Sequence, residues 1–287
     1  MKKLLSIILF FAATILIFSA CSASKKDQSG YLPYTAYISA SGTEGVGPVV
    51  DAARRYTYLR DDDIPAPQST TFSSKIMGVD YTANYDSKQI RAVFEPTYTY
   101  KTEDGDKITV DMSGNVVVFE TARYTSLFHT EADADNCLTP EEALTKATEY
   151  LSQIFGSQLA AEYSGELPDV WANSIRVRFR RIDAGFDPYT TTDKIIIKIS
   201  TEGDFLSFEA YNVGKYENKK LPDDFNDSKI TEIIKKSLID SAATIELSSE
   251  AKNLIILSDG RLACSTCFRI NDNGAVGEWV SVIIPLE

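Results

Sequence analysis

The hydrophobic and polar positions of the chain alternate over short runs through most of its length. From residue 75 onward these runs are rich in Val, Ile, Thr, Tyr and Phe, and clusters of Gly, Asn and Asp separate them. Runs of this kind are typical of β-strands joined by tight turns. We expect strands at Lys75–Tyr85, Ile90–Lys101, Lys107–Asp111, Asn115–Thr125, Ser174–Asp183, Asp193–Ser200, Asp204–Tyr211, Asn253–Leu257, Arg261–Ile270 and Glu278–Ile284.

Two other stretches repeat their apolar residues with the period of a helix. The first opens with Thr139 and Pro140, and Glu142 completes a capping box, which predicts a helix over residues 139–155. The second spans Ser228–Ala242. We expect the first helix to bury Leu144, Ala147, Leu151 and Ile154, and the second to present Ile230, Ile233, Ile234, Leu238 and Ala242 on one side.

The chain also contains an internal repeat. Lys107–Thr121 and Lys194–Tyr211 each read as an apolar strand, a polar turn with Gly, and a second strand that contains Phe-Glu. The last strands of the chain follow the same plan more loosely. The repeating unit is a helix followed by an antiparallel sheet, and such a helix can cover one sheet face. The pattern predicts an α+β fold of repeated helix-plus-antiparallel-sheet units.

Four segments carry a resemblance to a known family. They are Leu138–Ala143 at the start of the first helix, the strands Lys194–Ser200 and Phe205–Tyr211, and the hairpin Tyr98–Glu120. Together they resemble PepSY-type modules, in particular the repeated form in YcdB/YcdC-like bacterial surface proteins. The likeness extends over about residues 75–285 in two or three degenerate units.

The resemblance implies a non-catalytic module that binds or restrains peptidases or other partners in the cell envelope. It brings no catalytic residues with it. The family's D-x-x-T-G-x-V turn is degraded in this chain to Asp111–Val116 and Ser200–Phe205.

The N-terminus has the order of an export signal. Lys2 and Lys3 precede the apolar run Leu4–Phe18, and the small residues Ser19 and Ala20 follow directly before Cys21. A cysteine at this place is typical of a bacterial lipoprotein, whose thiol is acylated after cleavage. We therefore expect lipid on Cys21 to hold the protein on the extracytoplasmic face of the cell membrane. An uncleaved anchor and an ordinary secretory signal are the alternatives, and Phe18 stands where Leu is commonest.

Composition shifts divide the chain into five parts. We expect a signal peptide at 1–20, a flexible tether and linker at 21–70, and a β-rich unit at 71–137. A PepSY-like α+β unit at 138–220 and a degenerate α+β unit at 221–287 complete the chain.

The charge balance limits the partners. The chain has 29 Lys and Arg against 41 Asp and Glu, which gives a formal net charge of −12. A surface of this sign repels phosphate backbones, so we expect no nucleic acid as a partner. It favours basic peptides, and the alternative is that acidity only keeps the protein soluble.

Few residues suggest catalysis or metal binding. His129 is the single histidine, and the spacing of Cys264 and Cys267 on a predicted strand puts their thiols on opposite faces. We expect no metal and no cofactor. The sequence does not decide whether two of Cys137, Cys264 and Cys267 form a disulfide. The remaining enzymatic alternative is an envelope hydrolase that uses a carboxylate pair.

Aromatic residues around the Leu167–Val170 loop are candidates for a partner surface. Exposed aromatic rings on loops can stack on glycans or grip a peptide, whereas most aromatics of a β-rich protein belong to the core. The candidates are Tyr163, Trp171, Phe186 and Tyr189. The sequence as a whole predicts a non-catalytic binding or regulatory lipoprotein of the cell envelope, with the hydrolase as the alternative.

Overall fold

The structure is a computed structural model that describes most of the chain from residue 31 onward. The described residues are 31–39, 55–56, 64–91, 95–127, 137–171, 173–182, 186, 189–238, 244–249, 252–257, 259–272 and 275–287. The expected signal peptide and Cys21 lie outside them, as do His129 and Ala242.

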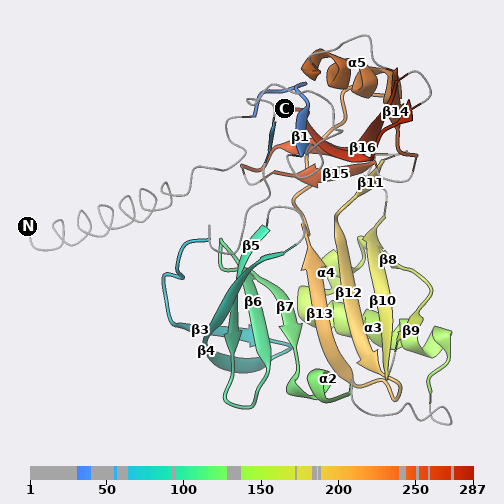
Figure 1. Ribbon diagram of the computed structural model, residues 1–287. Coiled ribbons are helices and arrows are strands. Elements are labelled where there is room, and N and C mark those ends of the chain that lie inside the picture. Colours follow the sequence, from blue (N-terminus) through green and yellow to red (C-terminus); the bar gives the residue numbers. More distant parts are fainter. Residues whose placement is uncertain are drawn as a thin grey trace, which may run out of the picture.

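Ten strands form the larger of two sheets, which lies in the lower part of Figure 1. All of its pairs are antiparallel, and β9 pairs with β10 beside the main path. In spatial order the strands are β3 (Thr71–Ile76), β4 (Val79–Arg91), β5 (Glu95–Lys101), β6 (Lys107–Asp111), β7 (Val116–Glu120), β13 (Phe205–Tyr211), β12 (Lys194–Ser200), β10 (Ser174–Arg181) and β8 (Tyr163–Gly165), with β9 at Asp169–Trp171.

The second sheet has eight strands and is mostly antiparallel. Its two parallel pairs are β1 with β2 and β11 with β15. The path is β11 (Thr190–Thr191), β15 (Asn253–Ile256), β16 (Leu262–Asp272), β18 (Val280–Pro285), β1 (Tyr37–Ser39) and β2 (Arg55–Tyr56), and both β14 (Thr244–Leu247) and β17 (Ala275–Val276) pair with β16.

Helices cover parts of both sheets. In Figure 1, α3 (Pro140–Phe155) and α4 (Ser157–Ala160) lie behind β10, β12 and β13, and α2 (Ala122–Leu127) lies at their lower end. The last helix, α5 (Asp227–Ser237), packs in the core of the second sheet through Ile230 and Ile234. The expected α+β class with antiparallel sheets is confirmed.

The first predicted helix is confirmed from its cap to its end. Thr139 is the N-cap, and both hydrogen bonds of the capping box with Glu142 are present. The buried side of α3 consists of Ala143, Ala147 and Leu151, each with no exposed surface. Leu144 and Ile154, which we expected to be buried, are only partly buried against the same core, so the predicted face is correct but less buried at its margins than expected.

The two sequence repeats are neighbouring hairpins. Lys107–Thr121 forms β6 and β7, Lys194–Tyr211 forms β12 and β13, and β7 pairs with β13. Both turns close with the same backbone bonds, because Gly114 N donates to Asp111 O and Gly203 N donates to Ser200 O, each at 3.0 Å. The two glycines have φ of 84° and 94°, as the bulge of a three-residue hairpin loop requires.

Four predicted boundaries are wrong. Lys75–Tyr85 spans the end of β3 and the start of β4, because Met77 and Gly78 take φ of 50° and 81° and reverse the chain. Ile90–Lys101 also spans two strands, since Ile90 near the end of β4 pairs with Pro96 of β5. The strand predicted at Asn115–Thr125 ends at Glu120, and α2 follows. The second predicted helix ends at Ser237, since Leu238 takes an extended conformation with ψ of 146°.

The tether prediction is wrong for residues 31–39. Ala36 and Ile38 are fully buried in the core of the second sheet, where β1 pairs with β18 at the other end of the chain. Their apolar side chains complete that core. No local sequence pattern indicates that these residues pair with a strand so distant in the sequence.

Candidate functional site

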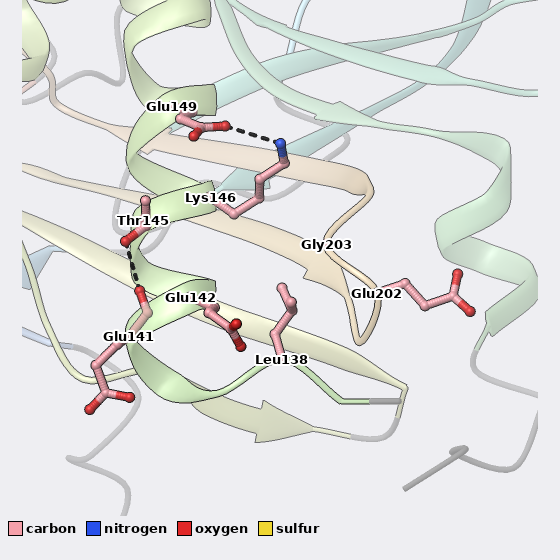
Figure 2. Close-up of a pocket in the computed structure, with 8 residues that line it drawn as sticks. All are labelled: Leu138, Glu141, Glu142, Thr145, Lys146, Glu149, Glu202 and Gly203. Atoms are coloured by element: carbon pink, nitrogen blue, oxygen red, sulfur yellow. Dashed lines mark hydrogen bonds and ion pairs between the residues drawn. The ribbon is translucent and has the colours of Figure 1, made fainter. Parts of the chain in front are cut away.

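A hollow of about 450 Å³ opens between the first turns of α3 and the turn that joins β12 to β13 (Figure 2). Its volume is within the usual range for a ligand site. Four of its side chains are glutamates and one is a lysine. The lining residues are Leu138, Glu141, Glu142, Thr145, Lys146, Glu149, Glu202 and Gly203.

Two hydrogen bonds fix the helix against the turn. Leu138 N donates to Thr201 O at 2.9 Å just before α3, and the Tyr150 hydroxyl donates to Gly203 O at 3.1 Å. A Cβ built on Gly203 would lie 3.1 Å from Leu138 Cδ1, so the turn and the helix start are in close contact there. The hollow is therefore built on two elements held together at two points.

Glu142 is the acid of the hollow whose position the cap of α3 fixes. Figure 2 shows Glu142 and Leu138 directed toward the space between helix and turn, and Glu141 directed away from it. Thr139 donates its backbone N–H and its hydroxyl to Glu142 Oε2, both at 2.9 Å. These two hydrogen bonds lower the pKa of Glu142. The carboxylate thus carries its charge well below neutral pH.

Lys146 does not cancel this charge on its own. Its Nζ donates to Glu149 Oε2 at 3.0 Å, and this bond and the charge of Glu149 raise the pKa of Lys146. The pair is neutral as a unit. The other acids of the lining are Glu141 and Glu142 on the helix and Glu202 on the turn, and Figure 2 shows the side chain of Glu202 directed away from α3.

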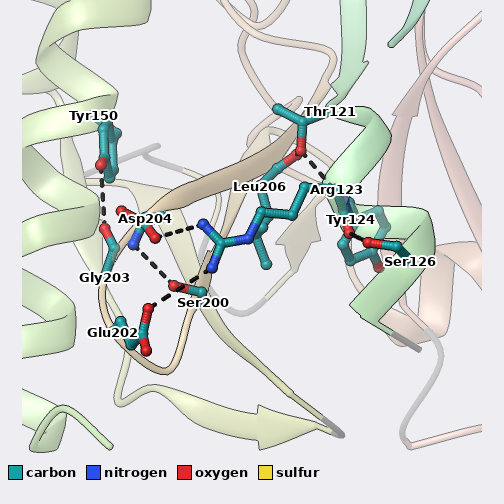
Figure 3. A network of polar contacts seen from close by, with 10 residues as sticks. All are labelled: Thr121, Arg123, Tyr124, Ser126, Tyr150, Ser200, Glu202, Gly203, Asp204 and Leu206. Atoms are coloured by element: carbon teal, nitrogen blue, oxygen red, sulfur yellow. Dashed lines mark hydrogen bonds and ion pairs between the residues drawn. The ribbon is translucent and has the colours of Figure 1, made fainter. Parts of the chain in front are cut away.

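An arginine from α2 supports the turn from its other side (Figure 3). Arg123 Nη1 lies 2.6 Å from Asp204 Oδ2, and its Nη2 lies 3.7 Å from Glu202 Oε2. Asp204 N also donates to Ser200 Oγ at 3.0 Å, which orders the turn from within. These contacts position Glu202 at the rim of the hollow and leave its side chain 64% exposed.

The structure does not bring the four predicted aromatic residues into one surface. Tyr163 is buried in the core of the ten-stranded sheet, and its hydroxyl donates to Asp193 Oδ1 at 2.5 Å. Phe186 and Tyr189 are buried in the core of the second sheet. Trp171 lies in β9. The prediction of an exposed aromatic surface is wrong for Tyr163, Phe186 and Tyr189, because their rings are buried in two separate cores.

The cysteines of the described part of the chain are free thiols. Cys137 is exposed, Cys264 is buried, and Cys267 is half-buried on the opposite face of β16. Burial raises the pKa of Cys264 to about 12, so this thiol is not reactive at neutral pH. Among the described residues, no three His, Cys, Asp or Glu side chains lie close enough together to hold a metal ion.

Within the same residues, no helix combines the length and the apolar character needed to cross a membrane.

Comparisons with known proteins give one weak structural likeness. No protein-family model matches the chain. No curated protein matches it either. Among solved structures, it is similar to the Bacillus megaterium YpeB C-terminal domain, with a TM-score of 0.31 and 14% sequence identity. The alignment covers 71% of this chain and 89% of that chain.

No sequence pattern indicated the hollow. It indicated the capping role of Glu142 and the turn at Gly203, and the resemblance used both segments. What it could not show is that the bond from Leu138 to Thr201 would bring the helix start against the turn. Without that contact, the sequence shows Glu202 only as a residue of the turn between two strands and does not place it near α3.

Proposed function

We propose that the protein is a non-catalytic, PepSY-like binding module that holds a basic peptide segment in the acidic hollow. The observation that carries the proposal is the hollow itself, with Glu142 directed into it, Glu202 at its rim and Lys146 neutralised by Glu149. A lysine or arginine side chain of the ligand would bind the Glu142 carboxylate in the hollow, and Glu202 would attract it at the rim. Its apolar stem would contact Leu138.

The charge of the whole chain supports the same class of ligand. A net charge of −12 attracts a basic peptide over a distance and accelerates its encounter with the surface. At physiological ionic strength, salt screens such attraction beyond a Debye length of about 8 Å. Binding of this kind should weaken as salt is added.

A hydrolase in the hollow is the less favoured alternative. Glycoside hydrolysis needs a general acid with a raised pKa beside a second carboxylate. The pKa of Glu142 is lowered by its hydrogen bonds. Burial raises the pKa of Asp193, but Asp193 is 1% exposed, is held by Tyr163 and does not line the hollow.

We further propose that the module acts outside the cytoplasm, held on the membrane by lipid on Cys21. The support is the sequence from Lys2 to Cys21. Cys21→Ser should move the protein from the membrane fraction to the soluble fraction or stall its processing. Normal cleavage with unchanged membrane retention would contradict the lipid anchor.

Charge-neutral variants test the ligand proposal. Glu142→Gln together with Glu202→Gln removes the charge in the hollow and the charge at its rim, and glutamine keeps the acceptor that the capping box needs. A lysine- and arginine-containing peptide should bind roughly fivefold more weakly, since an exposed charge contact contributes roughly 0.2–1 kcal/mol.

The matched control is Glu103→Gln together with Asp104→Asn. It removes the same total charge at two exposed residues that do not line the hollow. We expect nearly wild-type binding in titrations followed by fluorescence anisotropy. Equal losses in the two double variants would show that only the net charge matters and that the hollow is not the site.

A further inference from the structure

The sheet face opposite α3 carries a row of arginines. In β10, Val177 and Phe179 are buried in the core that includes α3. Successive side chains of a strand point to opposite faces, so Arg176, Arg178 and Arg180 lie on the other side. In Figure 1 this face of β10, β12 and β13 is turned toward the viewer.

The neighbouring strand β12 adds two lysines at unfavourable positions. Lys194 lies directly opposite Arg180, and Lys198 lies directly opposite Arg176. Like charges at opposed positions destabilise an antiparallel sheet. Between the lysines, Ile196 is only 8% exposed, which fits basic side chains that cover it with their apolar stems. The sheet thus retains two repulsive pairs around one apolar centre.

Most of these cations already have carboxylate partners. Arg178 approaches Asp169 Oδ2 with its Nη2 at 3.3 Å. The other pairs are Arg176 with Asp169 at 2.6 Å, Lys198 with Glu209 at 2.7 Å, and Arg180 with Glu166. Each of the three carboxylates is therefore engaged, and Asp169 serves two arginines.

Lys194 differs from its neighbours. Among the described residues, no carboxylate oxygen lies within 4 Å of its Nζ, which instead lies 4.9 Å from the centroid of the Tyr211 ring. Arg91 Cζ is 4.0 Å from the centroid of the same ring. Burial together with the positive charges of Arg180 and Arg178 lowers the pKa of Lys194. Lys194 is thus a half-buried cation among other cations, whose effect the charge of Glu209 offsets only in part.

We propose that Lys194 is the centre of an anion-binding site that takes the carboxylates of an extended acidic peptide. A bound carboxylate would supply the missing partner of Lys194 and relieve its repulsion with Arg180. The arginines of β10 recur at every second residue, and the side chains on one face of an extended peptide have the same spacing of about 7 Å. The site is separate from the acidic hollow, since none of its residues lines that hollow.

The charge of the sheet face and the charge of the whole chain together indicate which ligand the site takes. The face itself has five cations on β10 and β12 against three carboxylates, so it attracts an anion locally. The chain as a whole is strongly negative, which opposes a long polyanion such as a nucleic acid. A short acidic peptide segment satisfies both conditions.

The test uses the full chain in detergent and a labelled peptide of alternating Glu and Ala. Lys194→Gln should weaken binding about tenfold, on the scale of one hydrogen bond to a charged group. Lys194→Arg should keep most of the affinity, because it keeps the charge. Lys220→Gln, at an exposed lysine outside this face, should have no effect.

Two further measurements keep the outcome decisive. Lys194→Met retains much of the apolar stem, so it should fold and lose the same affinity as Lys194→Gln. Both variants should bind the basic peptide as the wild type does, which separates this site from the acidic hollow. Wild-type affinity of either variant for the acidic peptide would overturn the proposal. Binding of inorganic phosphate alone with the same affinity, and with the same loss in Lys194→Gln, would overturn the assignment to an acidic peptide.

Discussion

Phe119 and Phe208 lie directly opposite each other on the paired strands β7 and β13, with their ring centroids 6.5 Å apart. They occupy the same position after the turn glycine of each repeat, Gly114 and Gly203. Both rings are 2% exposed. The strands are antiparallel, so the two hairpins meet at equivalent residues with a local two-fold relation. The sequence repeat is thus also a packing interface within one sheet.

Truncating either ring should destabilise the protein strongly. Phe119→Ala and Phe208→Ala should each lower the free energy of unfolding by about 3–5 kcal/mol, because a large buried ring is lost. The double variant should lose less than the sum by about 0.5–1.5 kcal/mol, the usual coupling of an aromatic pair. Chemical denaturation of all four proteins measures this. Full additivity would show that the hairpins do not interact through these rings.

The buried side of α3 gives a second stability prediction. Leu151 is fully buried, so Leu151→Ala should lower the free energy of unfolding by about 2–5 kcal/mol. Gln153 is an exposed residue of the same helix, and Gln153→Ala should stay within about 0.5 kcal/mol of the wild type. A small effect at Leu151 would mean that α3 does not pack on the sheet through this side.

The turn at Gly203 links stability to the hollow. Gly203→Ala and Gly114→Ala both place a side chain at positive φ, which should cost about 1 kcal/mol each. Only at Gly203 does the new Cβ meet a neighbour, Leu138 Cδ1, whereas nothing lies within 4 Å at Gly114. Gly203→Ala should therefore destabilise more and weaken basic-peptide binding. If the two variants behaved alike in both measurements, the close contact at the turn would have no role.

The capping box predicts a pH dependence with a definite sign. Hydrogen bonds from Thr139 lower the folded-state pKa of Glu142 from its usual value of 4.5. The ionised carboxylate therefore contributes stability above pH 4.5, and this contribution is lost as the pH falls through the folded value. Glu142→Gln should unfold at a lower temperature than the wild type at pH 7, and the gap should close below pH 4.5. A gap that widens in acid would contradict the assignment.

Much of the fold was readable because its signals are local. The box from Thr139 to Glu142 and the alternation of Lys194–Ser200 both gave elements that the structure confirms. The hairpin turn at Met77 was missed because methionine seldom takes positive φ. The α2 helix was missed because Tyr124 and its neighbours favour strands locally, and contacts such as that of Lys198 Nζ with the Tyr124 hydroxyl, at 2.9 Å, come from distant parts of the chain.

The two candidate sites were harder to predict than the elements that carry them. The sequence showed Arg176, Arg178 and Arg180 as alternate residues of a strand, but it could not place Lys194 opposite Arg180. It likewise could not bring Glu202 to the start of α3. Register and tertiary contact decide both sites, and neither follows from spacing along the chain.

Photo-cross-linking tests the central claim most directly, because it reports where a basic peptide lies on the full chain. A lysine- and arginine-containing peptide with a photoreactive group should form adducts at the start of α3 and in the β12–β13 turn, around Leu138, Lys146 and Gly203. Glu142→Gln with Glu202→Gln should reduce these adducts, and added salt should do the same. Adducts found mainly on other surfaces, or unchanged in the double variant, would contradict the account of the hollow as the binding site.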